Sequence, residues 1–277
     1  MEPSDYLVVI DQALAEDLGD RGDITSNSVI SADSRSTGRI VARAPGIVAG
    51  VQVAGAVFER VDPTLSYRPA RSDGDPVDYG DAIATVDGPS RSILTAERTA
   101  LNLLGRMSGV ATATARLAEE VAGTGSRITD TRKTMPGLRM LDKHAVAAGG
   151  GVNHRFGLYD QVMIKDNHIV AAGSLEDAVA AARVAVGADV KITVEVENLS
   201  QLSVALSTSA DRVLLDNMDL GELRAAVEMV GGSVETEASG GVKLETVRAI
   251  AETGVDFISV GWITHSPPQL DVALDFA

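Results

Sequence analysis

The chain has 277 residues, enough for one large domain or two modest ones with a substantial core. Its 45% hydrophobic content excludes disorder, and its lack of cysteine excludes disulfides, thiolate metal sites and a cysteine nucleophile. A net charge of −15 disfavours polyanionic partners such as nucleic acid. Because we find neither a signal-peptide pattern nor an apolar run of about 18 residues, we expect a cytoplasmic protein that does not enter membranes.

The first part of the chain predicts two helices around a small sheet. Leu7, Ile10 and Leu14 recur at helical spacing, which predicts a helix over residues 4–18, followed by a turn-rich segment, GDRGDITS. Short Val/Ala/Gly segments then predict strands: GRIVARAPGIVAGV, VAGAVFERV and AIATVDGPS. Residues 93–117 predict a second helix, in which Gly105 and Gly109 are weak points.

From Arg127 onward, strand-like and helical segments alternate, which is typical of an α/β fold. Polar residues stand near the ends of successive strand-like runs, at Glu195, Asp216 and Glu237 and then at Gly261. Such repetition is typical of the mouth of an α/β barrel, so we expect an open or incomplete barrel, with a doubly wound sheet as the competitor. The strand-like runs are RITDT, QVMIK, KITVEVE, DRVLLDN, SVETEAS and DFISVGW.

The segment from Arg127 to His168 carries most of the functional information. It holds seven Lys or Arg residues against four Asp, within a chain that is acidic overall, and three of the four histidines. Cations gathered in one place of an acidic protein favour a small anionic ligand over a nucleic acid. The sequence therefore predicts an anion-binding active site in this segment. The histidines are His144, His154 and His168.

Several positions in this segment have more than one interpretation. TRKT at residues 131–134 is a pair of cations at a strand end, which suits a carboxylate ligand or a solvated turn. His154, in the glycine-rich GGGVNHRFG, donates to an anion or caps a turn. Lys165 is a ligand contact, a Schiff-base lysine or a solvated strand end. Asn167 and His168 are as readily structural as functional.

Carboxylates and glycine-rich loops complete the predicted site. Glu195 and Asp216 lie in apolar strands, where a carboxylate needs a cation, a hydroxyl or a metal as partner; Glu197 competes with Glu195 for the site-facing position. Since no metal-ligand spacing occurs, Mg²⁺ brought in with a phosphorylated substrate fits better than a dedicated metal cage. The loops ASGG at 238–241 and GWITHS at 261–266 predict a phosphate site.

The chain resembles the quinolinate phosphoribosyltransferase family across residues 13–266. The matching stretches are ALAEDLGDRGDITS, ERTALNLLGRMSG, TDTRKTMPGLRMLDKHAVAAGGGVNHRFGLYDQVMIKDNH, VEVEN, LLDNM, EASGG and SVGWITHS. The resemblance implies an N-terminal α/β sandwich over residues 1–107, rejoined by the tail 267–277. It also implies an incomplete, seven-stranded α/β-barrel catalytic domain over residues 108–266.

The resemblance further implies a pentosyltransferase that converts quinolinate and phosphoribosyl pyrophosphate, with Mg²⁺, to nicotinate mononucleotide, pyrophosphate and CO₂. It implies a homodimer, or a hexamer built of dimers, in which Arg98 is donated by the neighbouring subunit. Lys133, Glu195 and Asp216 would be catalytic. Thr131, Arg132, His154, Arg155 and Lys165 would bind substrates, and Ser239, Gly240, Gly241, Gly261 and His265 would hold the 5-phosphate. The alternatives are a paralogue acting on another base, a Schiff-base barrel aldolase using Lys165, and a phosphosugar-binding module.

Overall fold

The computed structural model describes residues 1–276, and their contacts divide the chain into two compact units. The first unit contains Met1–Ala115, Thr134–Gly150 and the segment from Trp262 onward; the second contains Arg116–Lys133 and Gly151–Gly261. This division by compactness places residues 134–150 with the first unit. The predicted domain boundary between residues 107 and 108 stays a prediction.

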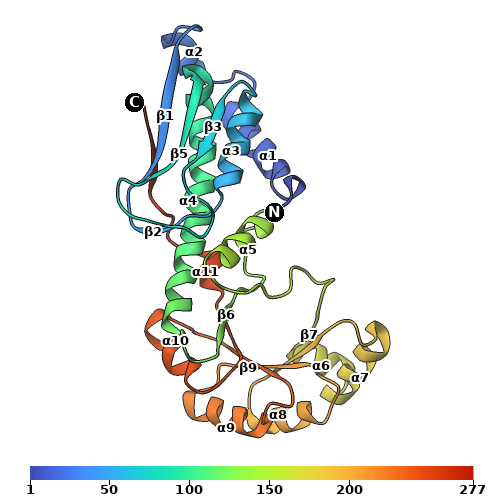
Figure 1. The fold of residues 1–277 in the computed structure, drawn as a ribbon. Helices are drawn as coiled ribbons and strands as arrows, with labels where there is room; N and C mark the ends of the chain where they lie inside the picture. Colours follow the sequence, from blue (N-terminus) through green and yellow to red (C-terminus); the bar gives the residue numbers. More distant parts are fainter. Residues whose placement is uncertain (277) are drawn as a thin grey trace. The chain divides into compact units, whose positions relative to one another are not determined.

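The first unit is built on a four-stranded antiparallel sheet in the order β12-β1-β5-β3 (Figure 1). From Ala84 onward, burial alternates along β5: Ala84, Val86 and Gly88 are buried and the residues between them are partly exposed, as expected for a sheet with one face on a core. A separate two-stranded sheet joins β2 to β4. The strands are β1 Arg35–Ala42, β2 Gly46–Ile47, β3 Ser66–Pro69, β4 Pro76–Val77, β5 Ala82–Pro89 and β12 Val272–Phe276.

The predicted strand VAGAVFERV is wrong, because these residues form the helix α3, Val51–Val61. Its β-branched residues suggested a strand, yet Ala54, Val57 and Phe58 are fully buried at helical spacing. The predicted helix at residues 4–18 is confirmed from Leu7 onward. The remaining helical elements of this unit are η1 Pro3–Asp5, α1 Leu7–Leu18, α2 Ile24–Val29, α5 Arg139–Ala148 and α11 Trp262–His265.

A single long helix, α4 Ser90–Glu120, confirms and extends the predicted helix over residues 93–117. Its glycines serve close packing and do not interrupt it. A Cβ added at Gly105 would lie 2.9 Å from the carbonyl oxygen of Leu270, and one at Gly109 would overlap the carbonyl oxygen of Pro268. The helix therefore carries glycine where the segment leading to β12 crosses it.

The second unit is an all-parallel sheet of six strands in the order β6-β11-β10-β9-β8-β7. The first strand pairs with the last, which is the arrangement of a barrel and excludes the doubly wound alternative. The predicted incomplete α/β barrel is confirmed. The strands are β6 Arg127–Thr129, β7 Val162–Ile164, β8 Ile192–Val196, β9 Arg212–Asp216, β10 Glu235–Ser239 and β11 Phe257–Ser259.

The expected seventh strand is reduced to a single bridge between Val152 and Thr129. The glycines at 149–151 weaken a strand before this point, and the His154 backbone N–H donates to the Asp130 carboxylate at 2.8 Å immediately after it. Because that donor is taken by a side chain, it does not continue a ladder. The barrel is open between Val152 and β7.

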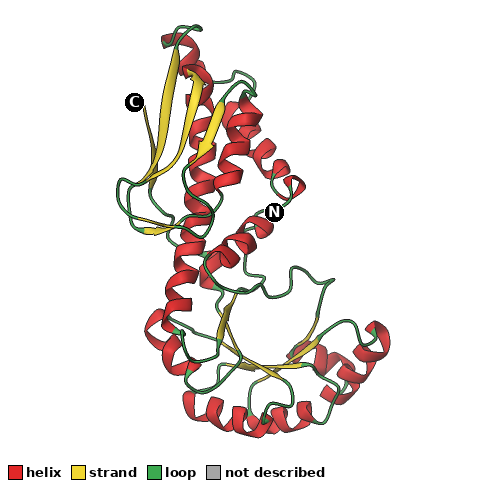
Figure 2. Cartoon of the chain, in the orientation of Figure 1, coloured by secondary structure: helices red, strands yellow, loops and turns green. Residues whose placement is uncertain are grey.

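Helices cover the outer side of the six strands (Figure 2). Several begin at side-chain caps, in which Ser174, Asn198 and Asp219 each accept a backbone N–H from the first turn. These helices are α6 Asp166–Ala172, α7 Leu175–Val186, α8 Leu199–Leu206, α9 Leu220–Val230 and α10 Leu244–Ala251. The carboxyl ends of the strands are thereby left to loops, at one edge of the barrel.

Candidate active site

Most predicted site residues lie in the second unit, at or just beyond the carboxyl ends of its strands. They lie at or after the ends of the six parallel strands and after the bridge residue Val152, so the sheet brings them to one edge, here called the barrel mouth. Arg98 and His265 belong to the first unit. The residues of the mouth are Thr131, Arg132, Lys133, His154, Arg155, Lys165, Glu195, Asp216, Ser239, Gly240, Gly241 and Gly261.

Lys165 and Glu195 form an ion pair between Nζ and Oε2 across the neighbouring strands β7 and β8. The Glu195 side chain is 15% exposed and that of Lys165 is 41% exposed. Glu197 lies beyond the end of β8, is exposed, and its backbone N–H donates to the side chain of Gln201. Of the two glutamates, Glu195 is therefore the one that reaches a predicted cation of the mouth.

Arg155 is held from both ends. Its backbone N–H donates to His154 Nδ1 at 2.6 Å, and its Nη1 donates to the carbonyl oxygen of Gln161 at 3.0 Å. Burial, followed by the nearby charge of Arg132, lowers the pKa of the Arg155 guanidinium. A bound anion would offset both effects, so Arg155 is a favourable partner for a carboxylate or phosphate.

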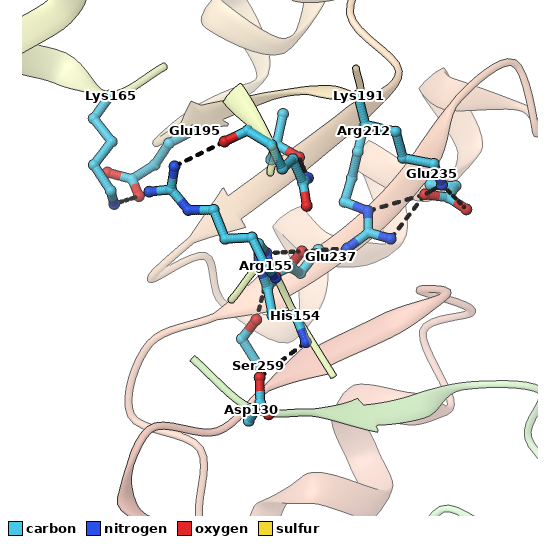
Figure 3. A network of polar contacts seen from close by, with 12 residues as sticks. Asp130, His154, Arg155, Lys165, Lys191, Glu195, Arg212, Glu235, Glu237 and Ser259 are labelled. Carbon is cyan, nitrogen blue, oxygen red and sulfur yellow. Dashed lines mark hydrogen bonds and ion pairs between the residues drawn. The ribbon is translucent and has the colours of Figure 1, made fainter. Parts of the chain in front are cut away.

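A buried polar network fills the barrel interior below the mouth (Figure 3). His154 Nε2 lies 3.2 Å from Oε2 of Glu237, and the same oxygen is 3.0 Å from Nη1 of Arg212. Ser259 Oγ donates to the other oxygen of Glu237. Arg212 continues to Glu235 at 2.8 Å. The imidazole of His154 is thus anchored to the inside of the barrel as well as to its neighbour along the chain.

Glu237 is completely buried, and its ionisation depends on these partners. Burial by itself would raise its pKa, but the contacts with His154, Ser259 and Arg212 outweigh burial and hold the pKa below its usual range. Sequence reasoning placed Glu237 near a strand end without a role and did not single out Arg212. The signal available in the sequence was a charged residue within a segment predicted to be a strand of the barrel.

The loops after β6 and β10 have the geometry of ligand-binding turns. The Lys133 backbone N–H donates to Thr131 Oγ1 at 3.0 Å, and both cations of this turn, Arg132 and Lys133, are exposed. After Ser239, Gly240 and Gly241 have φ values of 102° and 58°, which favour glycine strongly. This backbone can approach a ligand without side-chain obstruction. Gly261 follows the end of β11 after one intervening residue, Val260.

The two predicted residues of the first unit are both exposed. Arg98 lies on α4 with 64% of its side chain exposed, 3.9 Å from the carboxylate of Glu97. His265 ends the short helix α11. Both side chains are therefore accessible to solvent.

Oxygen ligands are present at the mouth, but no group of three or more His, Cys, Asp or Glu within residues 1–276 could hold a metal ion by itself. The half-buried Asp216 carboxylate accepts a hydrogen bond from the Asn217 side chain at 2.7 Å. Mg²⁺ prefers oxygen ligands and commonly keeps water and substrate phosphates in its shell. The residues present fit an ion held jointly with a substrate.

No helix of residues 1–276 has the length and apolarity needed to cross a membrane.

Comparison with known proteins places this site in a family. The N-terminal domain model of quinolinate phosphoribosyl transferase matches residues 23–108, and its C-terminal domain model matches residues 110–275. A probable carboxylating nicotinate-nucleotide pyrophosphorylase of Bacillus subtilis (strain 168) is 44% identical over 260 residues, covering 94% of this chain and 89% of that protein. The carboxylating enzyme of Mycobacterium leprae (strain TN) is 44% identical over 271 residues, covering 96% and 95%.

Solved structures agree with the sequence comparison. The nicotinate-nucleotide pyrophosphorylase of Francisella tularensis is 38% identical, with a TM-score of 0.96 over 100% of this chain and 98% of that chain. The enzyme of Ehrlichia chaffeensis is 39% identical, with a TM-score of 0.94 over 98% of both chains. Both domain models match in order, and the relatives align over nearly their whole length. The chain therefore belongs to the quinolinate phosphoribosyltransferase family.

Proposed function

We propose that this enzyme transfers the phosphoribosyl group of phosphoribosyl pyrophosphate to quinolinate and releases pyrophosphate and CO₂, forming nicotinate mononucleotide for NAD synthesis. The observation that carries the proposal is the set of cations at the barrel mouth of an acidic protein: Arg132, Lys133, Arg155 and Lys165. Both substrates are anions, quinolinate with two carboxylates. A concentrated positive field attracts them, while the remaining surface repels larger polyanions.

The cations have distinct tasks in this proposal. Arg132 and Arg155 present planar forks that match a carboxylate in a bidentate manner. Lys133 and Lys165 are compact charges that also suit phosphate oxygens. The glycine loop at 239–241 would hold the 5-phosphate through backbone N–H groups, together with Gly261 and His265.

In the reaction, the pyridine nitrogen attacks the anomeric carbon, and a C–N bond forms as the C–O bond to pyrophosphate breaks. Pyrophosphate leaves with the electron pair, and positive charge develops on the ribose. The carboxylates of Glu195 and Asp216 would stabilise that charge, and Lys133 would stabilise the leaving group. The cationic ring then accepts the electron pair released when the adjacent carboxylate leaves as CO₂, and a proton takes its place. Positioning and electrostatics carry the rate.

Mg²⁺ would be held by the substrate phosphates, with Glu195 and Asp216 contributing directly or through water. When bound, it neutralises charge on the departing pyrophosphate. The lysine that pairs with Glu195 would exchange part of this contact for the ligand. We also place the enzyme in the cytoplasm, although the relatives from rice and Arabidopsis are named as chloroplastic.

The deciding experiment offers quinolinate and nicotinate in parallel, with phosphoribosyl pyrophosphate and Mg²⁺, and follows nucleotide and CO₂. Turnover of quinolinate alone, with one CO₂ per nucleotide, is the expected result. Turnover of neither base would overturn the proposal in favour of a paralogue or a binding module. Borohydride trapping of a carbonyl substrate on Lys165 would instead support the aldolase; the ion pair with Glu195 argues against a free amine there.

The proposal includes a dimer in which Arg98 of each subunit completes the neighbour's site. Its exposed side chain supports this role. Mixing inactive Arg98→Ala and Lys133→Ala subunits should restore activity, because some sites then combine an intact mouth with an intact Arg98. Verified mixed dimers that stay as inactive as their parents would contradict the shared site.

A further inference from the structure

Asn217 has an unusual backbone for its place in the molecule. Its φ is 56°, and among residues 1–276 it is the one residue other than glycine with a positive φ. It directly follows Asp216, the last residue of β9. The left-handed conformation is costly for most side chains, and asparagine is one of the few residues that tolerate it. This residue lies at the barrel mouth, and uncommon backbone conformations of this kind are often found at functional sites.

Asn217 contacts both of the neighbouring ligand-binding positions. Its side-chain Nδ2 donates to Oδ2 of Asp216 at 2.7 Å. Its backbone N–H donates to the carbonyl oxygen of Ser239 at 2.9 Å, which extends the register in which Asp216 faces Ser239. One residue thus connects the carboxylate at the end of β9 to the glycine loop that follows β10.

The glycine loop fits closely against Asn217. A Cβ added at Gly240 would overlap the Asn217 side-chain oxygen and lie 3.0 Å from its backbone nitrogen. Gly240 also has a φ of 102°, which side chains rarely adopt. The absence of a side chain at 240 and the left-handed turn at 217 are therefore two halves of one packing arrangement.

Asn217 is not needed to cap the helix α9 that follows it, because Asp219 is the N-cap residue of that helix. Asp219 caps α9, because its side chain accepts the backbone N–H groups of Gly221 and Glu222 at 2.7 and 2.9 Å. Asn217 is exposed and does not supply the cap. Its side chain instead donates a hydrogen bond to the carboxylate of Asp216, the proposed ribose contact.

We propose that Asn217 is a positioning residue for the phosphoribosyl substrate: it orients the Asp216 carboxylate and fixes the distance from it to the glycine loop. The inference rests on the proposed function of Asp216 as a ribose contact and of residues 239–241 as a phosphate cradle. Quinolinate binding, which is assigned to Arg132 and Arg155, would not depend on Asn217. This difference between the two substrates makes the inference testable.

Two substitutions separate the side chain from the backbone. Asn217→Gly keeps the left-handed turn and removes the amide, whereas Asn217→Asp keeps the shape and replaces the donor with a second carboxylate beside Asp216. We expect either change to raise the KM for phosphoribosyl pyrophosphate about tenfold or more, the range for a lost hydrogen bond to a charged group. The KM for quinolinate should change less than about twofold, and Tm should stay close to that of the wild type.

Asn198→Ala is the matched control. Asn198 also follows a strand at the mouth, β8, but its side chain accepts the Gln201 backbone N–H and caps α8. Its loss should lower Tm and leave both KM values unchanged. Equal changes of both KM values in the Asn217 variants, or no change in either, would overturn the inference.

The packing arrangement is tested by a double-mutant cycle. Gly240→Ala introduces the overlap with the Asn217 side chain, and Asn217→Gly removes the atoms that it meets. The effects of the two changes on kcat/KM should therefore be less than additive when combined. Strict additivity would show that the two residues are not coupled. If the wild-type enzyme does not convert quinolinate at all, the proposed function fails; if it does and these variants behave like wild type, only the role of Asn217 fails.

Discussion

The core under the antiparallel sheet of the first unit and the interior of the barrel of the second are filled by different kinds of side chain. The sheet of the first unit packs on an apolar core that includes Ile40, Phe58 and Ile83, each fully buried. The barrel of the second unit buries charge in its interior, with Glu237 fully buried and Arg212 nearly so. Apolar burial contributes stability directly, whereas a buried charged network requires every partner to be in place. Mutations in the apolar core of the antiparallel sheet should therefore act through stability alone, whereas mutations in the buried network of the barrel should act through stability and catalysis together.

The largest effect on stability should come from a mutation in the apolar core of the antiparallel sheet. Phe58 is fully buried and its ring centroid lies 5.7 Å from that of Tyr67. Phe58→Ala should lower the free energy of unfolding by about 3–5 kcal/mol, because transfer and cavity contributions add. Denaturant unfolding measures the loss, and KM values of the remaining folded enzyme should match wild type. A large change in KM without loss of stability would contradict this distinction between the apolar core of the sheet and the buried network of the barrel.

Glu237→Ala should show both kinds of effect. It leaves Arg212 and His154 without their shared carboxylate and should cost about 3 kcal/mol of stability, the lower end for a broken buried pair. It should also lower kcat/KM, since His154 is joined to Arg155. Glu235→Ala is the control, because Glu235 is 35% exposed and its loss leaves Arg212 paired with Glu237. Equal activity in the two variants would remove the link between network and mouth.

A smaller effect, confined to catalysis, should follow from Arg155→Lys. Losing a bidentate contact to a carboxylate should cost about 1.5–3 kcal/mol of transition-state stabilisation, with little change in Tm. Steady-state kinetics measure it as a fall in kcat/KM. Arg127→Lys is the matched change at the opposite ends of the strands, where Arg127 packs on the Phe257 ring at 4.4 Å. It should leave kcat/KM at the wild-type value; a loss below a factor of two at Arg155 would make its proposed role untenable.

The smallest effect concerns acid stability. The pKa of Glu237 is held below its ordinary value of 4.5 in the folded protein. The stabilisation from its ionised form is therefore complete above that value and is lost as the pH falls through the lower, folded-state pKa. Glu237→Gln should flatten the stability profile on the acid side of about pH 4.5 and leave the slope near neutrality unchanged. An unchanged acid limb, followed by circular dichroism, would assign acid unfolding to other carboxylates.

Sequence patterns predicted the barrel well because its signals are local. Each β-strand of the barrel coincides with a run that the sequence predicted as a strand. Glu195 and Asp216 were visible as polar residues at the ends of two apolar runs. The α3 segment was mistaken for a strand because valine favours strands locally, while tertiary burial of one helical face decided the outcome. Seven strands were expected, and the reduction of the seventh to a single bridge was not predicted. It depends on the hydrogen bond from the His154 backbone N–H to the Asp130 side chain, which takes the place of the next ladder bond.

The parts of the site that sequence could not provide are those that depend on contacts between distant residues. The ion pair of Lys165 with Glu195 joins residues in different strands, and the choice of Glu195 over Glu197 required the register of β8. The Glu237 network likewise joins β9, β10 and β11 with the turn that holds His154. Spacing in one sequence carries no information about such pairs.

The pairing of β1 with β12 has a consequence for synthesis on the ribosome. Gly38 lies opposite Phe276 in this ladder, so one edge of β1 stays unpaired until residues 272–276 have emerged. The barrel residues are made after the antiparallel pair of β1 and β5 and before β12. The nascent chain therefore carries an open sheet edge through most of its translation, and such edges favour pairing with other chains. Slow folding dominated by this distant contact, with a need for protection against aggregation during synthesis, is the expected result.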